Sequence, residues 1–460
     1  MLQLPEEFIE KYRRLLGDEA PAFLASFDQP SHSGFRVNPL KAAPTATIDK
    51  ATGRVPYVPT GYYGTIDGKS LDHVTGAIYS QEPSAMYVGE VVDPQPGERV
   101  LDLCAAPGGK TTHLVAKMKD TGLLVANEIF RKRAKVLAEN LERWGTRSTV
   151  VMNESPADLE EQFPHFFDRI LVDAPCSGEG MFRKEPAGIE YWNPDYPAEC
   201  ANRQRKILAS AMKMLKPGGI LVYSTCTFAP EEDEQNLAWL LATYPDLKTV
   251  PIKKYPGMDD GRRDWADNNP ALADAVRLFP HHIAGEGHFI AKLQNGEPAA
   301  GAVPSPAKRR RKKKQRHQQR SGLDKAAQAE FAAVRDILQP GYEPGRLLTF
   351  GDQLYALPAG MPADLAGMTI LRPGLHLGTF KKNRFEPALA WALATDPATC
   401  PTTLALDHDQ WRQYVHGDVV TVESGHPNGW YLLTCDGFAT GFGKLVGTTV
   451  KNFYPKGLRF

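Results

Sequence analysis

The middle of the chain alternates short apolar runs, typical of buried strands, with longer stretches whose apolar positions have helical spacing. The predicted elements lie at residues 100–103, 114–118, 122–126, 131–144, 148–152, 169–172, 203–215, 219–224 and 231–243. Strands that alternate with helices indicate a parallel sheet covered by helices on both faces. We therefore predict a doubly wound α/β core, with a Rossmann-like arrangement, over residues 86–293.

The pattern before this core differs from it. Helical apolar spacing at Phe8, Tyr12, Leu15 and Leu16 gives way to turn-rich sequence, which predicts a small N-terminal accessory module over residues 1–85. After the core, residues 294–322 are rich in Gly, Pro and Ala and then strongly basic from Lys308 to Arg320. This composition predicts a flexible linker. Either it is only a solvated connection between domains, or its basic residues bind the phosphates of RNA.

The sequence beyond this linker predicts further folded regions. A helix at residues 326–338 and strand-like pieces at 347–350 and 354–357 predict an intermediate domain over residues 323–385. Residues 386–460 contain short, aromatic, Gly-punctuated strands at 418–422, 429–435 and 438–444. We expect these strands to form a small β-barrel, so that the C-terminal region is α+β followed by β.

The composition is that of a soluble globular protein. The 460 residues are too many for one ordinary core, and 54 basic side chains balance 54 acidic ones, so that attraction to nucleic acid depends on uneven placement of charge. The N-terminus lacks the pattern of a signal peptide, and no apolar stretch approaches the roughly 18 residues of a membrane helix. We expect a cytoplasmic protein without a membrane partner.

No metal site is expected from the spacing of cysteines and histidines. The six cysteines include no C-x-x-C pair, which favours neither a disulfide framework nor zinc. His281 and His282 are adjacent but have no further ligand at metal-binding spacing, and we interpret them as structural.

A loop of small residues follows the first predicted strand of the core. Backbone without side-chain bulk can approach a ligand closely, and the amides at the start of the next helix favour an anionic group. The spacing matches neither the Walker pattern nor G-x-G-x-x-G, which argues against ATP and NAD. A tight strand-to-helix turn without a ligand is the alternative. The loop residues are Cys104, Ala105, Ala106, Pro107, Gly108, Gly109 and Lys110.

Polar side chains stand at the ends of three later strands. Glu128 ends the second predicted strand, where an acid in a Rossmann-like unit accepts hydrogen bonds from ribose hydroxyls, and Asp173 ends a later one. Asn153, between them, could reach an adenine edge. Each has an alternative, purely structural role, since Glu128 and Asp173 could cap a turn and Asn153 could form part of one.

Two cysteines follow strand ends on the same predicted edge. Cys176 lies in Asp173-Ala174-Pro175-Cys176-Ser177-Gly178, and Cys226 lies in Ser224-Thr225-Cys226-Thr227. Most cysteines are buried core residues, but two that converge on a ligand edge favour chemistry. A thiolate that adds to carbon 6 of cytosine makes carbon 5 able to attack a sulfonium methyl group, and a second group must then help the elimination.

In this order, CAAPGGK, DAPCSG and STCT resemble the motifs of the Nop/Sun (NSUN) family of RNA cytosine-5 methyltransferases, which have a class I S-adenosyl-L-methionine-dependent fold. The resemblance implies that Cys226 is the nucleophile and that Cys176 assists product release. It also implies that the cofactor contacts the 104–110 loop, Glu128 and Asp173, with Arg133 a further candidate whose alternative is a solvated helix face. Asn153 departs from the family, which more often carries Asp there.

The resemblance extends to both ends of the chain. Residues 35–38 and 81–84 resemble the family's N-terminal elements, and residues 277–282 with 285–289 resemble its closing strand region. The C-terminal residues 429–459 resemble the PUA-like tail of the bacterial RsmF group, which modifies 16S ribosomal RNA. The resemblance therefore implies methylation of carbon 5 of cytosine in 16S rRNA or the small ribosomal subunit, and a role in RNA binding for residues 1–85 and 386–460.

Three alternatives stay open at this point. Transfer RNA or large-subunit RNA could be the substrate of the same chemistry. A non-catalytic RNA-binding or ribosome-assembly protein is disfavoured by the two cysteines, Asp173 and the intact loop. Methylation of DNA usually takes its nucleophile from the Pro-Cys position, so that the additional Thr-Cys motif favours RNA.

Overall fold

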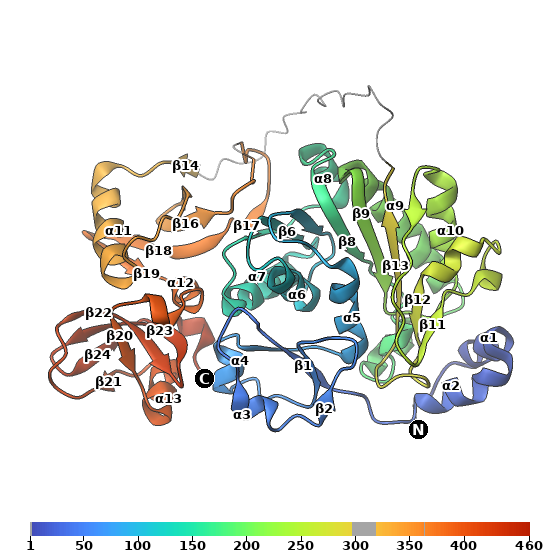
Figure 1. Ribbon diagram of the computed structural model, residues 1–460, viewed down its shortest axis with the longest axis horizontal. Helices are drawn as coiled ribbons and strands as arrows, with labels where there is room; N and C mark the ends of the chain where they lie inside the picture. The colour runs from blue at the N-terminus through green and yellow to red at the C-terminus, as the bar shows by residue number, and fades with distance from the viewer. Residues whose placement is uncertain (1, 297–318, 363) are drawn as a thin grey trace.

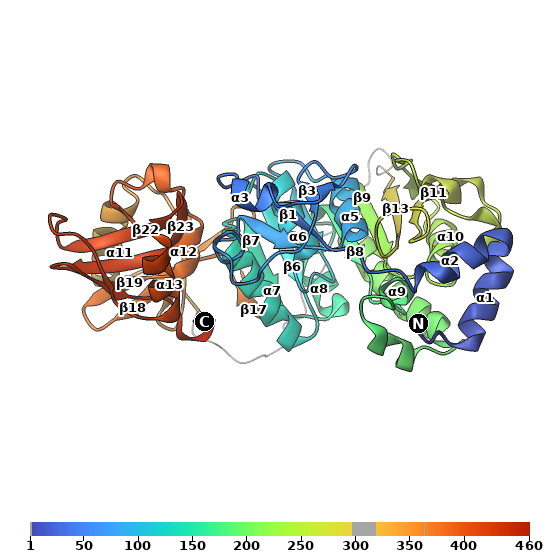
Figure 2. The same cartoon turned by 90° about the horizontal axis from the view of Figure 1, so that it is seen from below.

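The computed structural model describes residues 2–296, 319–362 and 364–460 (Figure 1). The molecule is elongated, with N-terminal helices at one end, a large sheet in the middle and the C-terminal strands at the other end (Figure 2). The basic residues between Lys308 and Arg316 lie outside the described residues.

The central sheet has ten strands, of which five are parallel. Their order is β7-β6-β5-β8-β9, with bounds Thr149–Met152, Leu123–Asn127, Arg99–Asp102, Phe167–Asp173 and Leu215–Thr225. Beyond β9 the sheet continues antiparallel through β13 (His288–Gln294), which also pairs with β10 (Lys248–Thr249), and then β12 (Val276–Leu278) and β11 (Met258–Asp260). Chain progression reverses between β5 and β8, and an open α/β sheet binds its ligands at such a point.

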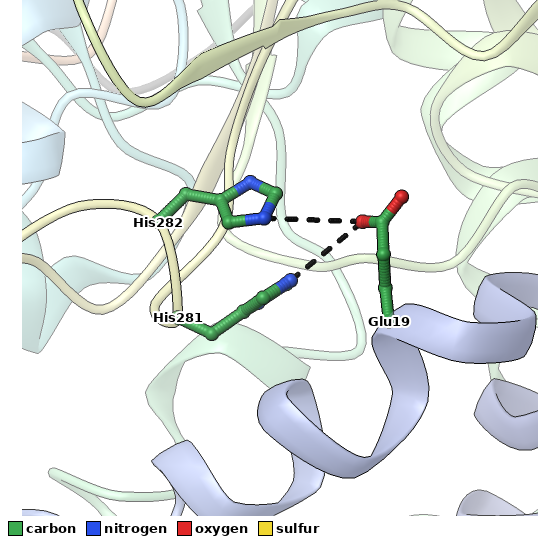
Figure 3. A group of neighbouring side chains, drawn as sticks. All are labelled: Glu19, His281 and His282. Carbon is green, nitrogen blue, oxygen red and sulfur yellow. Dashed lines mark ion pairs between the residues drawn. The ribbon is translucent and has the colours of Figure 1, made fainter.

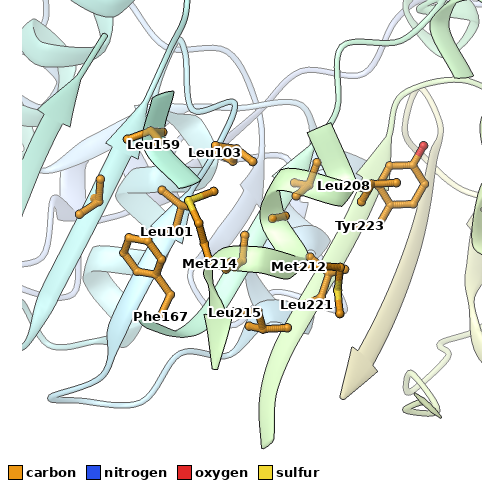
Figure 4. Packing of buried hydrophobic residues seen from close by; sticks show 14 of the residues in the cluster. Leu101, Leu103, Leu159, Phe167, Leu208, Met212, Met214, Leu215, Leu221 and Tyr223 are labelled. Carbon is orange, nitrogen blue, oxygen red and sulfur yellow. The ribbon is translucent and has the colours of Figure 1, made fainter. Parts of the chain in front are cut away.

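Alternating side chains of these strands pack against two layers of helices, as the predicted doubly wound core requires. Val100, Leu124 and Leu171 face the layer of α5 (Pro83–Val92), α6 (Gly109–Lys117) and α7 (Arg131–Trp144). Leu101, Ile170 and Leu221 face α8 (Pro156–Gln162), α9 (Tyr196–Met214) and α10 (Glu234–Thr243). Figure 4 shows this second core, in which Leu159 and Leu208 meet the strand side chains.

The N-terminal module combines helices with a sheet that the turn-rich sequence did not reveal. An aromatic cluster that includes Phe8 and Phe23 packs α1 (Glu6–Leu16) and α2 (Ala20–Ser26) against Phe228 and Phe279 of the core. The sheet has the order β2-β3-β1-β4, with bounds Gly53–Arg54, Gly61–Tyr63, Gly34–Val37 and Ile78–Ser80. Two short helices accompany it, α3 (Thr45–Ile48) and α4 (Leu71–Val74).

The C-terminal region has two sheets that share a hydrophobic core. The first is β14-β15-β16-β18-β19, with bounds Gln319–Ser321, Arg346–Phe350, Gln353–Leu357, Leu375–Lys381 and Arg384–Pro387. The second is β20-β22-β23-β24-β21, with bounds Thr403–Ala405, Gly429–Cys435, Phe438–Val446, Thr449–Asn452 and Val420–Thr421. Their helices are α11 (Lys325–Leu338), α12 (Leu389–Leu393) and α13 (His408–His416). Phe331, Trp391 and Phe442 belong to one buried cluster, which joins the two sheets.

One strand of the C-terminal region belongs to the central sheet. β17 (Ile370–Arg372) pairs antiparallel with β7, and the buried Arg372 guanidinium donates to the carbonyls of Thr146 and Thr149. The C-terminal region is therefore anchored to the edge of the α/β core. No helix in the described part of the chain has both the length and the apolarity needed to cross a bilayer.

Candidate active site

A cavity of about 670 Å³ opens at the carboxyl ends of the parallel strands, next to the point where chain progression reverses. This volume lies within the range of small-molecule sites. Its walls come from the ends of β5, β6, β8 and β9, from the start of α8 and from α9. They consist of Leu103, Cys104, Ala106, Asn127, Glu128, Ile129, Phe130, Arg133, Ser155, Pro156, Ala157, Asp173, Ala174, Pro175, Cys176, Arg203, Lys206, Ile207, Ser210 and Cys226.

The 104–110 loop runs from β5 to the start of α6, which begins at Gly109. Gly108 has φ of 115°, a conformation that favours glycine, and it precedes the first helical turn. Asp102, buried at the end of β5, accepts a hydrogen bond from the Thr111 hydroxyl at 2.7 Å. The Arg36 guanidinium of the N-terminal module donates to the Gly109 carbonyl at 2.6 Å. The loop is therefore fixed from two sides.

Glu128 is held with its carboxylate at the cavity wall. Its side chain is 4% exposed, its Oε1 accepts the Phe130 amide at 2.9 Å, and its Oε2 lies 3.4 Å from the Arg133 guanidinium. Arg133 also donates to the Ala106 carbonyl at 2.8 Å. The side-chain amide of Asn153 donates to the carbonyls of Glu128 and Ile129, both at 2.8 Å. Asn153 therefore orders the backbone around Glu128.

Asp173 receives hydrogen bonds on both carboxylate oxygens. The Lys110 ammonium lies 2.7 Å from Oδ2, and the Ser224 hydroxyl donates to Oδ1 at 2.8 Å. Burial opposes the charge of Lys110, but the paired Asp173 carboxylate outweighs it and raises the pKa of Lys110. This pairing fixes an anionic group beside the two thiols.

The two thiols converge as their positions past β8 and β9 predict. Cys176 Sγ lies 3.3 Å from Cys226 Sγ. The Gly180 amide donates to the Cys226 carbonyl at 2.9 Å, and the hydroxyls of Ser177 and Thr227 lie 2.8 Å apart, so that the two loops hold each other. The hydrogen bond with Cys226, followed by burial, raises the pKa of the Cys176 thiol well above its usual value. Cys176 therefore stays protonated at neutral pH and can donate to Cys226.

The structure brings together most, but not all, of the residues that the sequence singles out. Those that line the cavity are Cys104, Ala106, Glu128, Arg133, Asp173, Cys176 and Cys226. Ala105, Pro107, Gly108, Gly109, Lys110 and Asn153 do not line it, and Lys110 and Asn153 act on it through their contacts with Asp173 and Glu128.

The sequence reasoning missed two groups of wall residues. The first group is Ile129 and Phe130, whose side chains are 54% and 62% exposed. Their position directly after the strand-end acid Glu128 was the sequence feature that could have indicated an apolar wall. Arg203, Lys206, Ile207 and Ser210 have helical spacing and turn one face of α9 to the cavity. The arrangement thus combines a thiol pair, two fixed carboxylates, an apolar wall and a basic rim, which suits covalent chemistry on an anionic substrate.

Comparisons with known proteins cover nearly the whole chain. Residues 90–294 match the model of 16S rRNA methyltransferase RsmB/F, and residues 4–83 match the N-terminal domain of 16S rRNA methyltransferase RsmF. Residues 330–395 match the RsmF rRNA methyltransferase first C-terminal domain, and residues 401–460 match the methyltransferase RsmF PUA domain.

Relatives and solved structures agree with these matches. Ribosomal RNA small subunit methyltransferase F of Vibrio vulnificus is 31% identical, with 99% of this chain and 97% of the relative covered. The same protein of Shigella boydii is 30% identical over 99% and 96%. A methyltransferase homologue from Pyrococcus horikoshii is 31% identical with a TM-score of 0.57, covering 64% of this chain and 96% of its own. NSun6 from Pyrococcus horikoshii, at 22% identity and a TM-score of 0.57 over 64% and 99%, shares the fold.

Proposed function

Since the chain belongs to the RsmB/F family of 16S rRNA methyltransferases, we propose that it methylates carbon 5 of a cytosine in 16S rRNA through a covalent bond between Cys226 and carbon 6. The observation that carries the chemistry is the pair of thiols 3.3 Å apart at the cavity wall. A non-catalytic RNA-binding protein would have no need of two thiols held at this distance in a cavity.

The cavity fits S-adenosylmethionine as the methyl donor. The Glu128 carboxylate is held at the end of β6, where a ribose hydroxyl pair is bound in Rossmann-like folds, and Ile129 and Phe130 offer exposed apolar surface beside it. We infer that Glu128, Asp173 and the 104–110 loop hold the cofactor, with Arg133 and Asn153 acting through Glu128. When bound, the cofactor supplies an electrophilic methyl group on a sulfonium ion.

The two thiols have opposite tasks in the reaction. The Cys226 thiolate forms a bond to carbon 6, which makes carbon 5 nucleophilic enough to accept a methyl group. Water that enters the open cavity then takes the carbon 5 proton, the electron pair of that bond forms the double bond between carbons 5 and 6, and the bond from carbon 6 to sulfur breaks to release the Cys226 thiolate. Cys176, which stays protonated, donates to Cys226 and so stabilises the departing thiolate. Asp173 ends β8, accepts a hydrogen bond from Ser224 of β9 and pairs with Lys110. We infer that its carboxylate, fixed in this way beside the thiols, orients the cytosine.

The substrate proposal rests on the relatives. The proteins of Vibrio vulnificus and Shigella boydii are named for the small ribosomal subunit, and they align over almost the whole of this chain. We infer that this chain acts on 16S rRNA or the small subunit, in the cytoplasm. The family's PUA domain matches residues 401–460, and an RNA-binding role for that region accords with the proposal.

Single replacement of each thiol tests the mechanism. Cys226→Ala should abolish methyl transfer and any adduct, because no bond to carbon 6 can form. Cys176→Ala should still attack and methylate, but stall before release, and should appear on a denaturing gel as an RNase-sensitive band of slower mobility. The double variant should form no such band. Accumulation of the adduct in Cys226→Ala, and not in Cys176→Ala, would reverse the two assignments.

A further inference from the structure

A second group of chemically active side chains lies outside the cavity. Glu19 stands in the short turn Gly17–Glu19 between α1 and α2, and His281 and His282 follow β12. Figure 3 shows both imidazole rings directed toward one oxygen of Glu19. That oxygen, Oε2, lies 3.7 Å from His281 Nε2 and 3.9 Å from His282 Nε2. None of the three residues lines the cavity of the thiols.

The His281 side chain is buried among aromatic rings, and its ring nitrogens lack hydrogen-bond partners within the described residues. Its side chain is 6% exposed, and its ring lies 5.7 Å from that of Phe23 and 5.6 Å from that of Phe279. Neither Nδ1 nor Nε2 has a hydrogen-bond partner in the described parts of the chain. A buried polar group without a partner destabilises the folded protein, so that a ligand for His281 Nε2 would remove an energetic penalty.

The surrounding side chains orient the other two members of the group. Asp259 Oδ2 lies 2.8 Å from His282 Nδ1, which directs the remaining nitrogen of that ring, Nε2, toward Glu19. Carboxylates in this position are the usual outer partners of metal-binding histidines. Arg262 donates to both oxygens of Glu19 at 3.1 Å. The charge of Arg262 opposes a cation, while the carboxylates of Glu19 and Asp259 favour one and outnumber it.

We propose that Glu19, His281 and His282 bind one divalent transition-metal ion, with Zn²⁺ the preferred occupant. Two imidazole nitrogens and one carboxylate are a common zinc ligand set, which leaves a fourth position for water. Ligand atoms around a tetrahedral zinc ion lie roughly 3.3 Å apart, given bonds of about 2.0–2.1 Å. The two separations from Glu19 Oε2, 3.7 and 3.9 Å, exceed this by about half an ångström, and the three ligand atoms lie within 4.8 Å of one another. Rotation of the half-exposed Glu19 and His282 side chains would bring them to this distance.

The ligand spacing was not visible in the sequence, because Glu19 is brought to the histidines by the packing of α1 and α2 on the core. The expectation of structural histidines and no metal rested on the pair alone. A bound ion would connect the N-terminal helices to the segment that closes the central sheet, in addition to the aromatic cluster there. In the competing arrangement no metal is bound, and His282 contacts Asp259 through Nδ1 and Glu19 through Nε2.

Metal titration of the full chain distinguishes these arrangements. Chelator-treated protein should bind one equivalent of Zn²⁺ in calorimetry, and Co²⁺ at the same site should give the absorption of a tetrahedral complex. Glu19→Gln and His282→Ala, both at half-exposed side chains, should each weaken Zn²⁺ binding more than tenfold. The matched control is His408→Ala, which disrupts the second group of potential ligands, His408, Cys435 and Asp436, and should leave the stoichiometry at one.

Thermal denaturation provides a second readout that does not depend on activity. Zn²⁺ should raise the melting temperature of the wild-type chain and of His408→Ala, but not that of Glu19→Gln, because only binding to the folded state stabilises it. Absence of stoichiometric Zn²⁺ binding by the wild-type chain would overturn the proposal. Equal Zn²⁺ affinity in the wild type, Glu19→Gln and His282→Ala would overturn it as well.

Discussion

At the scale of single residues, Asp102 shows that the 104–110 loop is supported at a cost in stability. It is completely buried at the end of β5, and burial raises its pKa to about 7 despite the hydrogen bond from Thr111. Its Oδ1 has no hydrogen-bond partner among the described residues. Because the folded protein holds this proton more tightly than the unfolded chain does, stability falls as the pH rises from about 4 through 7.

Asp102→Asn should remove this dependence. The amide keeps an acceptor for Thr111 but has no charge to bury, so that the free energy of unfolding at pH 8 should rise by roughly 1–3 kcal/mol over the wild type. The two proteins should be nearly equal at pH 4. Denaturant unfolding at both pH values measures the difference. Parallel pH profiles of the two proteins would contradict the argument that Asp102 is buried as a neutral acid.

The residue scale also shows where sequence reasoning succeeds. Cys176 and Cys226 were predicted to meet because each follows a parallel strand, and strand ends in one sheet share an edge. Asn153 is predicted from its strand-end position to reach an adenine edge, and in the structure its side-chain amide donates to the carbonyls of Glu128 and Ile129. A strand-end position predicts the neighbourhood of a side chain, whereas its partners depend on tertiary contacts.

At the scale of elements, α9 presents a basic rim to the cavity. Arg203 and Lys206 are exposed, lie one turn apart and line the same wall as Cys176. Lys213 lies on the same helix beyond the cavity, paired with Glu160 at 2.7 Å. If α9 guides the RNA backbone toward the thiols, Arg203 and Lys206 neutralise phosphates and Lys213 does not.

Arg203→Ala combined with Lys206→Ala should therefore raise KM for RNA roughly tenfold and lower the salt dependence of RNA binding. Affinity for S-adenosylmethionine should change less, because the ionic partners of Glu128 and Asp173 are Arg133 and Lys110 rather than these two residues. Lys213→Ala serves as the control and should retain the wild-type KM. A loss of cofactor affinity without a change in KM for RNA would assign this rim to the cofactor instead.

Elements were predictable where their apolar pattern is long and regular. The helix expected at residues 131–144 coincides with α7, because its one apolar face repeats over several turns. The sheet β2-β3-β1-β4 was not predicted, since its strands have two to four residues and alternate with turns. β17 was not predicted either, because its three residues are specified by pairing with β7 rather than by their own pattern.

At the scale of the whole molecule, regions far apart in the sequence meet at the α/β core. Arg36 of the N-terminal module fixes the start of α6, and β17 of the C-terminal region extends the central sheet. The two C-terminal sheets share one buried cluster, so that removing residues 386–460 would expose Phe331 and its neighbours. Substitutions on the surface of the intact chain are therefore a cleaner test of the C-terminal region than its deletion.

The last strands of the chain offer such a surface. Lys444 of β23 stands directly opposite Lys451 of β24, and both side chains are exposed. Like charges at opposed positions destabilise a sheet, which favours a role for this pair in meeting an anionic partner. Trp430, on the strand paired with β23, stands opposite Lys444, and the Lys444 ammonium lies 6.0 Å from the centre of its largely buried ring.

Lys444→Ala combined with Lys451→Ala should therefore weaken binding of the natural RNA several-fold and reduce the slope of its salt dependence by up to about 2, since two phosphate contacts are lost. Methyl transfer at saturating RNA and affinity for S-adenosylmethionine should stay at wild-type levels, because the pair is remote from the thiols. Lys248→Ala combined with Lys253→Ala removes the same charge from exposed positions at and just after β10, outside the N-terminal module and α9, and should change none of these quantities. Equal salt slopes for the wild type and the double lysine variant would exclude this strand surface from RNA binding and leave substrate selection to the N-terminal module and the rim of α9.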